Sequence, residues 1–135
     1  MKEYEKIILG IDPGTNILGY GLIGINKNSM ELISTGIVRM QKLENHQLKL
    51  KKIFESITHI IEEYLPDEVA VEAPFFGKNV QSMLKLGRAQ GVAMAATLVK
   101  GLPIVEYAPR KIKQSLTGKG SASKEQVAEM IKNLL

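Results

Sequence analysis

Residues 7–15 have the sequence IILGIDPGT, and the arrangement of the rest of the chain follows from this stretch. An apolar run of this length that ends in a Pro-Gly turn predicts a strand buried on both faces, here Lys6–Ile11. Such a strand belongs at the centre of a sheet that is covered by helices. We therefore expect Asp12 at the carboxyl end of a central strand, where α/β sheets tend to bind ligands and metals.

A second carboxylate follows a second apolar run. The run Val69–Val71 ends in Glu72, directly before a turn at Ala73-Pro74. On its own, Asp12 before Pro-Gly is an ordinary turn residue, because its side chain can hydrogen-bond nearby amides. If the two strands are parallel neighbours, however, Asp12 and Glu72 meet at one sheet edge, and two such charges recruit a cation. Hard oxygen ligands suit Mg²⁺ or Mn²⁺, so the pair predicts a site for phosphodiester hydrolysis with two ions roughly 3.5–4 Å apart.

The composition limits the class of protein. A chain of 135 residues suits one domain, residues 1–135, which buries roughly two-thirds of its unfolded surface. The chain has no cysteine, which excludes disulfides and thiolate metal sites. No stretch resembles a signal peptide or a membrane span, so we expect a cytoplasmic protein. The net charge of +4 permits a polyanionic partner without requiring one.

The remaining pattern predicts an α/β fold. Short turns join the first three strands, so these strands form an antiparallel meander. A helix follows, with apolar positions at helical spacing, until Pro66 ends it. A strand after a helix can return parallel to the first strand. The expected strands are Lys6–Ile11, Ile17–Ile25, Glu31–Met40, Val69–Glu72 and Pro103–Tyr107, and the long helices start at Leu50 and span Val80–Lys100.

Two histidines and a stripe of small residues lie outside the carboxylate pattern. His46 and His59 lie away from the carboxylate turns in the sequence, so we expect both at the surface rather than as metal ligands. In the second helix, Gly87, Gly91 and Ala95 fall on one stripe, which allows the close approach of another backbone. This stripe either packs on the protein's own sheet or forms a subunit interface, and spacing alone favours neither.

Two further segments carry residues suited to nucleic acid. Thr117–Lys124 is rich in glycine and lysine, and Lys119 and Lys124 are placed to grip phosphates at the start of the last helix. A flexible basic turn is the equal alternative, and the spacing of a Walker A loop is absent. Phe75-Phe76, beside Lys78, can stack on an unpaired base, and we expect one ring buried and one exposed.

The same residues resemble the RuvC family of crossover junction endodeoxyribonucleases, the Holliday junction resolvases. The resemblance implies a ribonuclease H-like fold, with a mixed five-stranded sheet and helices on both sides. It also implies a homodimer that binds a four-way DNA junction and makes two symmetrical nicks in recombination and repair, together with the branch-migration proteins RuvA and RuvB. The matching stretches cover the whole chain in the family's order: Ile8–Thr15 with Gly19-Tyr20-Gly21, Glu72 with Phe75–Asn79, Leu84–Gly91, and Glu106–Arg110 continuing through Lys113, Gly118, Gly120 and Lys124.

The resemblance further implies roles for individual residues. Asp12 and Glu72 map to catalytic carboxylates that bind two Mg²⁺ ions per subunit, with Mn²⁺ as an alternative. Lys113 and Lys124 map to catalytic lysines near the cleaved strand, where they position phosphate or stabilise developing charge. Phe75 maps to the aromatic that stacks at the opened junction centre. The helix of Gly87 and Gly91 maps to the dimer interface. The residues expected to contact DNA are Phe75, Lys78, Asn79, Lys119 and Lys124.

The family pattern continues into a further helix with one or two acidic or histidine metal ligands. Here the chain ends at Leu135, and Glu125 and Glu129 do not match that motif. We therefore expect a nuclease domain that is truncated at its C-terminus and has two metal ligands instead of three or four. Such a polypeptide would keep the fold and junction binding but cleave weakly or not at all. In a full-length form, Asp12→Asn is expected to abolish cleavage and leave junction binding intact.

Other classes fit part of the pattern. Actin-like and sugar-kinase-like nucleotide-binding proteins also have a first strand that ends in Asp-x-Gly-Thr, but they need a second phosphate loop and usually a second domain. A non-catalytic junction-binding fragment is the alternative that the missing ligands favour. RuvC-like nucleases that act on RNA precursors share the Asp-Pro-Gly opening, whereas the stretch Gly118–Lys124 favours the DNA resolvase.

Overall fold

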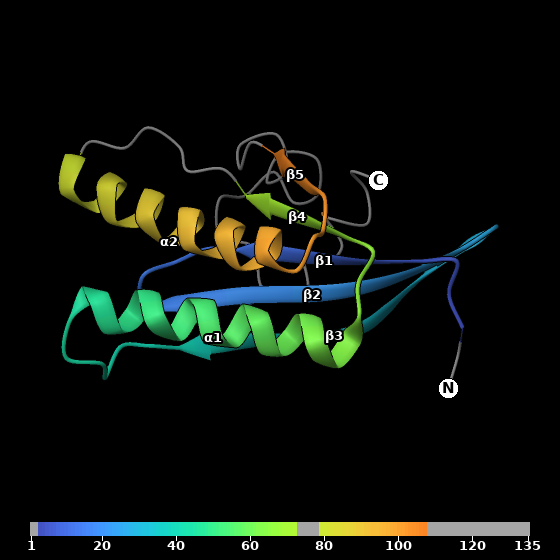
Figure 1. The fold of residues 1–135 in the computed structure, drawn as a ribbon, viewed down its shortest axis with the longest axis horizontal. Coiled ribbons are helices and arrows are strands. Elements are labelled where there is room, and N and C mark those ends of the chain that lie inside the picture. Colours follow the sequence, from blue (N-terminus) through green and yellow to red (C-terminus); the bar gives the residue numbers. More distant parts are fainter. Residues whose placement is uncertain (1–2, 73–78, 108–135) are drawn as a thin grey trace.

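The computed structural model describes residues 3–72 and 79–107. They form a five-stranded sheet with the strand order β3-β2-β1-β4-β5 and two long helices (Figure 1). Neither of these helices has the length and apolar character needed to cross a membrane. The strands are β1 (Lys6–Asp12), β2 (Ile17–Asn26), β3 (Ser29–Arg39), β4 (Glu68–Glu72) and β5 (Ile104–Tyr107), and the helices are α1 (His46–Tyr64) and α2 (Val80–Val99).

β1 lies at the centre of the sheet, as its apolar sequence predicts. It pairs antiparallel with β2, and β2 pairs antiparallel with β3, which confirms the meander. On its other side β1 pairs parallel with β4, and β4 pairs parallel with β5, so the sheet is mixed. Asp67 fixes the parallel register. Its carboxylate accepts a hydrogen bond from the Ile7 amide at 2.7 Å, and its own amide donates to the Ile7 carbonyl at 2.7 Å.

Both described helices pack on one face of the sheet (Figure 1). Alternate residues of β1, β2 and β4 form that face, because side chains on a strand point to opposite sides in turn. On the other face Ile8, Ile23 and Ala70 are also buried, as expected for a sheet covered on both sides, but the predicted helix cover of that face lies outside the described residues. The main core consists of Leu9, Ile11, Leu18, Leu22, Met40, Ile53, Ile57, Ile60, Ile61, Val69, Val71, Ala89, Ala93 and Ala96.

α1 begins earlier than its apolar spacing predicts. The spacing indicates a start at Leu50, but the helix begins at His46 because Asn45 caps it. The Asn45 side chain accepts a hydrogen bond from the Leu48 amide at 2.8 Å, which satisfies one of the free donors of the first turn. At the other end, Leu65 adopts the left-handed conformation with φ of 51° and closes the helix.

α2 turns its alanines, rather than its glycines, towards the core. Ala89, Ala93 and Ala96 are fully buried. A Cβ atom added at Gly87 or Gly91 would meet nothing within 4 Å. The alternative that these two glycines pack on the protein's own sheet is therefore wrong for the part of the chain that the structure describes.

Candidate active site

The carboxyl ends of β1 and β4 place Asp12 and Glu72 next to each other. Ile11 pairs with Val71, so the two carboxylate residues, one position further along each strand, are neighbours across strands that lie about 4.8 Å apart. Ile11 and Val71 face the helices, and side chains alternate along a strand, so both carboxylates face the opposite side of the sheet. This strand geometry is the one that the two apolar runs predict, and the metal-binding role of the pair stays a prediction.

A tight turn leads the chain away from Asp12. Glycine is required at position 14, because a Cβ atom there would lie 2.1 Å from the carbonyl oxygen of Ile17. The Met40 amide donates a hydrogen bond to the Asn16 carbonyl at 2.8 Å, which ties this turn to the end of β3. The turn therefore gives Asp12 a fixed position at the sheet edge, where its side chain is half-buried.

The donor set fits a hard divalent cation. Carboxylate oxygens from adjacent strands are ligands that Mg²⁺ and Mn²⁺ prefer. Within residues 3–72 and 79–107, no third aspartate, glutamate, histidine or cysteine joins the pair in a cluster. The described residues thus offer two carboxylates, and such a cation would complete its coordination with other oxygens.

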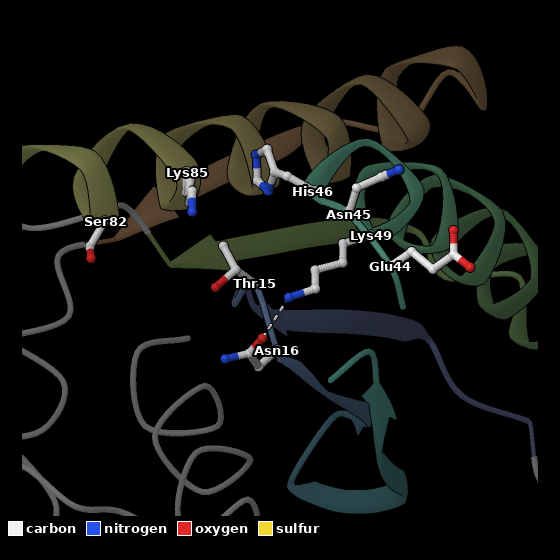
Figure 2. A pocket seen from close by; sticks show the side chains of 8 residues that line it. All are labelled: Thr15, Asn16, Glu44, Asn45, His46, Lys49, Ser82 and Lys85. Atoms are coloured by element: carbon white, nitrogen blue, oxygen red, sulfur yellow. Dashed lines mark hydrogen bonds between the residues drawn. The ribbon is translucent and has the colours of Figure 1, made fainter. Parts of the chain in front are cut away.

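A polar pocket of about 480 Å³ lies at the same end of the sheet, next to the two helices. Its walls come from the turn after β1, the start of α1 and the first turns of α2 (Figure 2). The Lys49 ammonium donates a hydrogen bond to the side-chain oxygen of Asn16 at 2.8 Å, drawn as the dashed line in Figure 2. We call this the helix-start pocket, and its lining residues are Thr15, Asn16, Glu44, Asn45, His46, Lys49, Ser82 and Lys85.

The sequence did not indicate this pocket, and His46 is the lining residue whose position differs most from its prediction. Of the two histidines expected at the surface, His59 is exposed, but His46 is partly buried. Its Nε2 atom is buried and has no hydrogen-bond partner among the described residues. Burial, and then the charges of Arg88, Lys85 and Lys49, lower the pKa of His46 below its ordinary value. His46 is therefore less exposed than predicted, because the earlier start of α1 brings it beside the turn that follows β1.

The other predicted site residues have different outcomes. The side chain of Asn79 caps α2 by accepting a hydrogen bond from the Ser82 amide at 3.1 Å, and its contact with DNA stays a prediction. Phe76 and the loop Thr117–Lys124 lie outside the described residues. So do the predicted site residues Phe75, Lys78, Lys113, Lys119 and Lys124.

Gln90 holds the edge strand β5 at this end of the sheet. Its side chain is buried and donates a hydrogen bond to the Glu106 carboxylate at 2.6 Å. Glu106 pairs with Val71 in the register, so the bond ties α2 to the strand beside β4. The sequence gives no signal for this contact, since a glutamine in a helix is usually exposed.

The sequence is similar to that of one group of proteins over nearly all of its length. Residues 8–135 match the model of a family described as crossover junction endodeoxyribonuclease RuvC. The protein of this name from Porphyromonas gingivalis is 58% identical, and the alignment covers 100% of this chain and 71% of that protein. The one from Cytophaga hutchinsonii is 62% identical, over 99% of this chain and 67% of that protein.

Solved structures agree with these sequence matches. The structure of Thermus thermophilus RuvC in complex with Holliday junction substrate matches with a TM-score of 0.76 and 30% identity, over 97% of this chain and 80% of that chain. The yeast mitochondrial Holliday junction resolvase Ydc2 matches with a TM-score of 0.57 over 92% of this chain and 75% of that chain. At 10% identity, this second likeness concerns the fold alone.

Proposed function

Because the chain belongs to the RuvC family of crossover junction endodeoxyribonucleases, we propose that it resolves four-way DNA junctions by metal-dependent hydrolysis of phosphodiester bonds. The observation that carries the proposal is the pair Asp12 and Glu72, adjacent at one sheet edge and on one face. The likeness to a RuvC structure that contains Holliday junction substrate supports the choice of a four-way junction as the substrate. RuvA and RuvB as partners, and a cytoplasmic location, follow from the family resemblance.

We assign metal binding to Asp12 and Glu72. Mg²⁺ bound there supplies activation of water and stabilisation of the leaving oxygen. Both carboxylates face away from α1 and α2, so the scissile phosphate approaches the opposite side of the sheet. Lys113 and Lys124 are assigned to the cleaved strand, and Phe75 to the opened junction centre.

We also propose that the outward stripe of α2 forms the interface of a homodimer. Gly87, Gly91 and Ala95 lie on this stripe between Leu84 and Leu98, whose side chains are exposed. The open space at the two glycines lets a second helix approach closely, since the distance between helix axes depends on the side chains at the contact. Two active sites related by a two-fold axis can then cut two strands symmetrically.

Gly91→Arg is expected to convert this dimer to a monomer, because the long charged side chain would fill the space that the partner helix needs. The matched control is Gly91→Ala, which adds one methyl group and should remain a dimer. Sedimentation measures the mass of each variant, and thermal melting checks its fold. A Gly91→Arg protein that is folded and still dimeric would place the interface elsewhere.

The direct test of the function uses a labelled four-way junction and a linear duplex of the same sequence. Each is incubated with the chain and Mg²⁺ and run on native and denaturing gels. We expect selective binding of the junction and paired symmetrical nicks that EDTA abolishes. Equal cutting of the duplex, or no binding of the junction, would contradict the proposal. If Mg-ATP raised the melting temperature of the chain and the junction did not bind, a nucleotide-binding protein would be favoured.

A further inference from the structure

The helix-start pocket lies close to the carboxylate pair but is separate from it. Asp12 and Glu72 face the side of the sheet away from the helices, whereas the pocket is lined by the starts of α1 and α2. Thr15, in the pocket wall, follows Asp12 by three residues, so their Cα atoms are at most about 11 Å apart. This span is short enough for a nucleic-acid strand to cross the sheet edge from the carboxylates to the pocket within a few nucleotides.

The pocket is electropositive. Lys49 and Lys85 both line it. Burial, followed by the positive charges of Arg88, Lys85 and Lys49, lowers the pKa of His46. Among the described residues, neither Lys85 nor Arg88 forms an ion pair with a carboxylate. The one carboxylate in the lining belongs to Glu44, and in Figure 2 it points away from the lysines.

The chemistry of the lining fits a phosphate group better than a base or a sugar. All eight lining residues are polar or charged. His46 carries the one aromatic ring among them, and its Nε2 atom is buried, so the pocket offers little surface on which a base could stack. The hydroxyls of Thr15 and Ser82 and the ammonium groups of two lysines can all donate to phosphate oxygens. The buried Nε2 of His46 adds a polar group that no described residue satisfies.

We propose that the helix-start pocket binds a backbone phosphate of the DNA strand that passes over the sheet edge from the cut site. The proposal rests on the function proposed above, because it takes DNA as the ligand. The phosphate is held by Lys85 from α2 and by Lys49 from α1, the two elements whose starts form the pocket walls. This contact positions the strand and carries no sequence information.

Lys85→Gln tests the proposal. The Kd for the junction is measured at several salt concentrations in EDTA, so that no cleavage occurs. Loss of one phosphate contact is expected to raise Kd about five- to tenfold and to reduce the slope of log K against log salt by about 1. Lys85→Arg keeps the charge and should bind like the original chain, which a purely structural role for the lysine would not require.

Lys51→Gln is the matched control. Lys51 lies two residues from Lys49, about 200° around α1, and 72% of its side chain is exposed. Its replacement by glutamine removes the same charge as Lys85→Gln. Its Kd and salt slope should stay within about twofold and about 0.3 of the original values. If Lys85→Gln and Lys51→Gln had the same Kd and salt slope while the original chain bound the junction, the phosphate site in the pocket would be wrong and the proposed function would stand. Failure of the original chain to bind the junction would overturn the proposed function as well.

Inorganic phosphate separates a DNA phosphate from a free one. We expect phosphate to weaken junction binding only at concentrations where it acts as salt, and equally in the original chain and in Lys85→Gln. If micromolar phosphate shifted the melting temperature of the original chain but not that of Lys85→Gln, the pocket would be a site for free phosphate and the proposal would be wrong.

Discussion

Cleavage of a four-way junction is expected to fall by at least about a thousandfold when Asp12 is replaced with asparagine, while Kd for the junction changes by less than about threefold. Asparagine keeps the size of the side chain but removes the charge that holds a divalent cation. A thousandfold loss corresponds to about 4 kcal/mol of transition-state stabilisation, which is in the range that metal ions supply. Glu72→Gln should have the same effect, because Glu72 is the neighbour of Asp12 on the same face.

Single-turnover cleavage and junction binding are measured on the same preparations. Calorimetric titration with Mn²⁺ adds a readout that does not depend on turnover, so the loss of the site is visible even where cleavage is slow. The matched control is Glu68→Gln, which lies on the same face of β4 but at its other end, where Glu68 pairs with Lys6 at 2.9 Å. Partly exposed pairs contribute only about 0–1 kcal/mol, so this variant should cleave within about twofold of the original chain.

The alternative to a metal-binding role is that Asp12 stabilises the turn. An aspartate before Pro-Gly can serve as a turn residue whose side chain hydrogen-bonds nearby amides. In that case Asp12→Asn would lose thermal stability, junction binding and cleavage together, and Mn²⁺ binding would no longer distinguish the two roles. The metal-binding role requires that Asp12→Asn keeps its junction binding and its melting temperature but loses affinity for Mn²⁺.

The sheet and its carboxylate pair are predictable from the sequence because each depends on a local pattern. An apolar run buried on both faces has to lie in the middle of a sheet, and a helix between two strands allows the parallel pairing of β1 with β4. Asp12 and Glu72 meet because each is the first charged residue after its run, and parallel strands end at the same edge.

The helix-start pocket is not predictable in this way. Its residues come from three segments that are far apart in the chain, and only the packing of α1 beside α2 brings them together. The sequence also carries no clear signal for the start of α1, because Asn45 is followed by two polar residues and no glutamate completes a capping box. His46 consequently has the sequence context of a loop and the structural position of a helix start.

The buried face of α2 is ambiguous in the sequence for a different reason. Ala89 and Ala93 have the same spacing of four residues as Gly87 and Gly91 and are larger by only one methyl group, so two stripes of the helix allow close packing. Only the contacts show that the alanines face the core and the glycines do not. Small residues at helical spacing therefore predict a close approach but do not identify which neighbour approaches.

Leu9→Ala is expected to lower the free energy of unfolding by about 2–5 kcal/mol, the largest loss of stability that we expect from a single side chain here. Leu9 is 0% exposed and lies at the middle of β1, between Leu22 of β2 and Val69 of β4. Its truncation leaves a cavity where the sheet meets the helices. Since domains are stable by only about 5–15 kcal/mol, the variant should lose a large part of its stability.

Urea unfolding followed by circular dichroism measures this loss, and Leu65→Ala is the matched control, because it deletes the same atoms from a leucine that is 73% exposed. The control should change the free energy of unfolding by less than about 0.5 kcal/mol. Leu9 shares its strand with Asp12, but its side chain faces the helices and not the carboxylates. Below its melting temperature, Leu9→Ala should therefore bind Mn²⁺ with nearly the original affinity. A folded Leu9→Ala protein that has lost Mn²⁺ binding would mean that core packing under β1, and not the register of β1 with β4 alone, sets the position of the carboxylate pair.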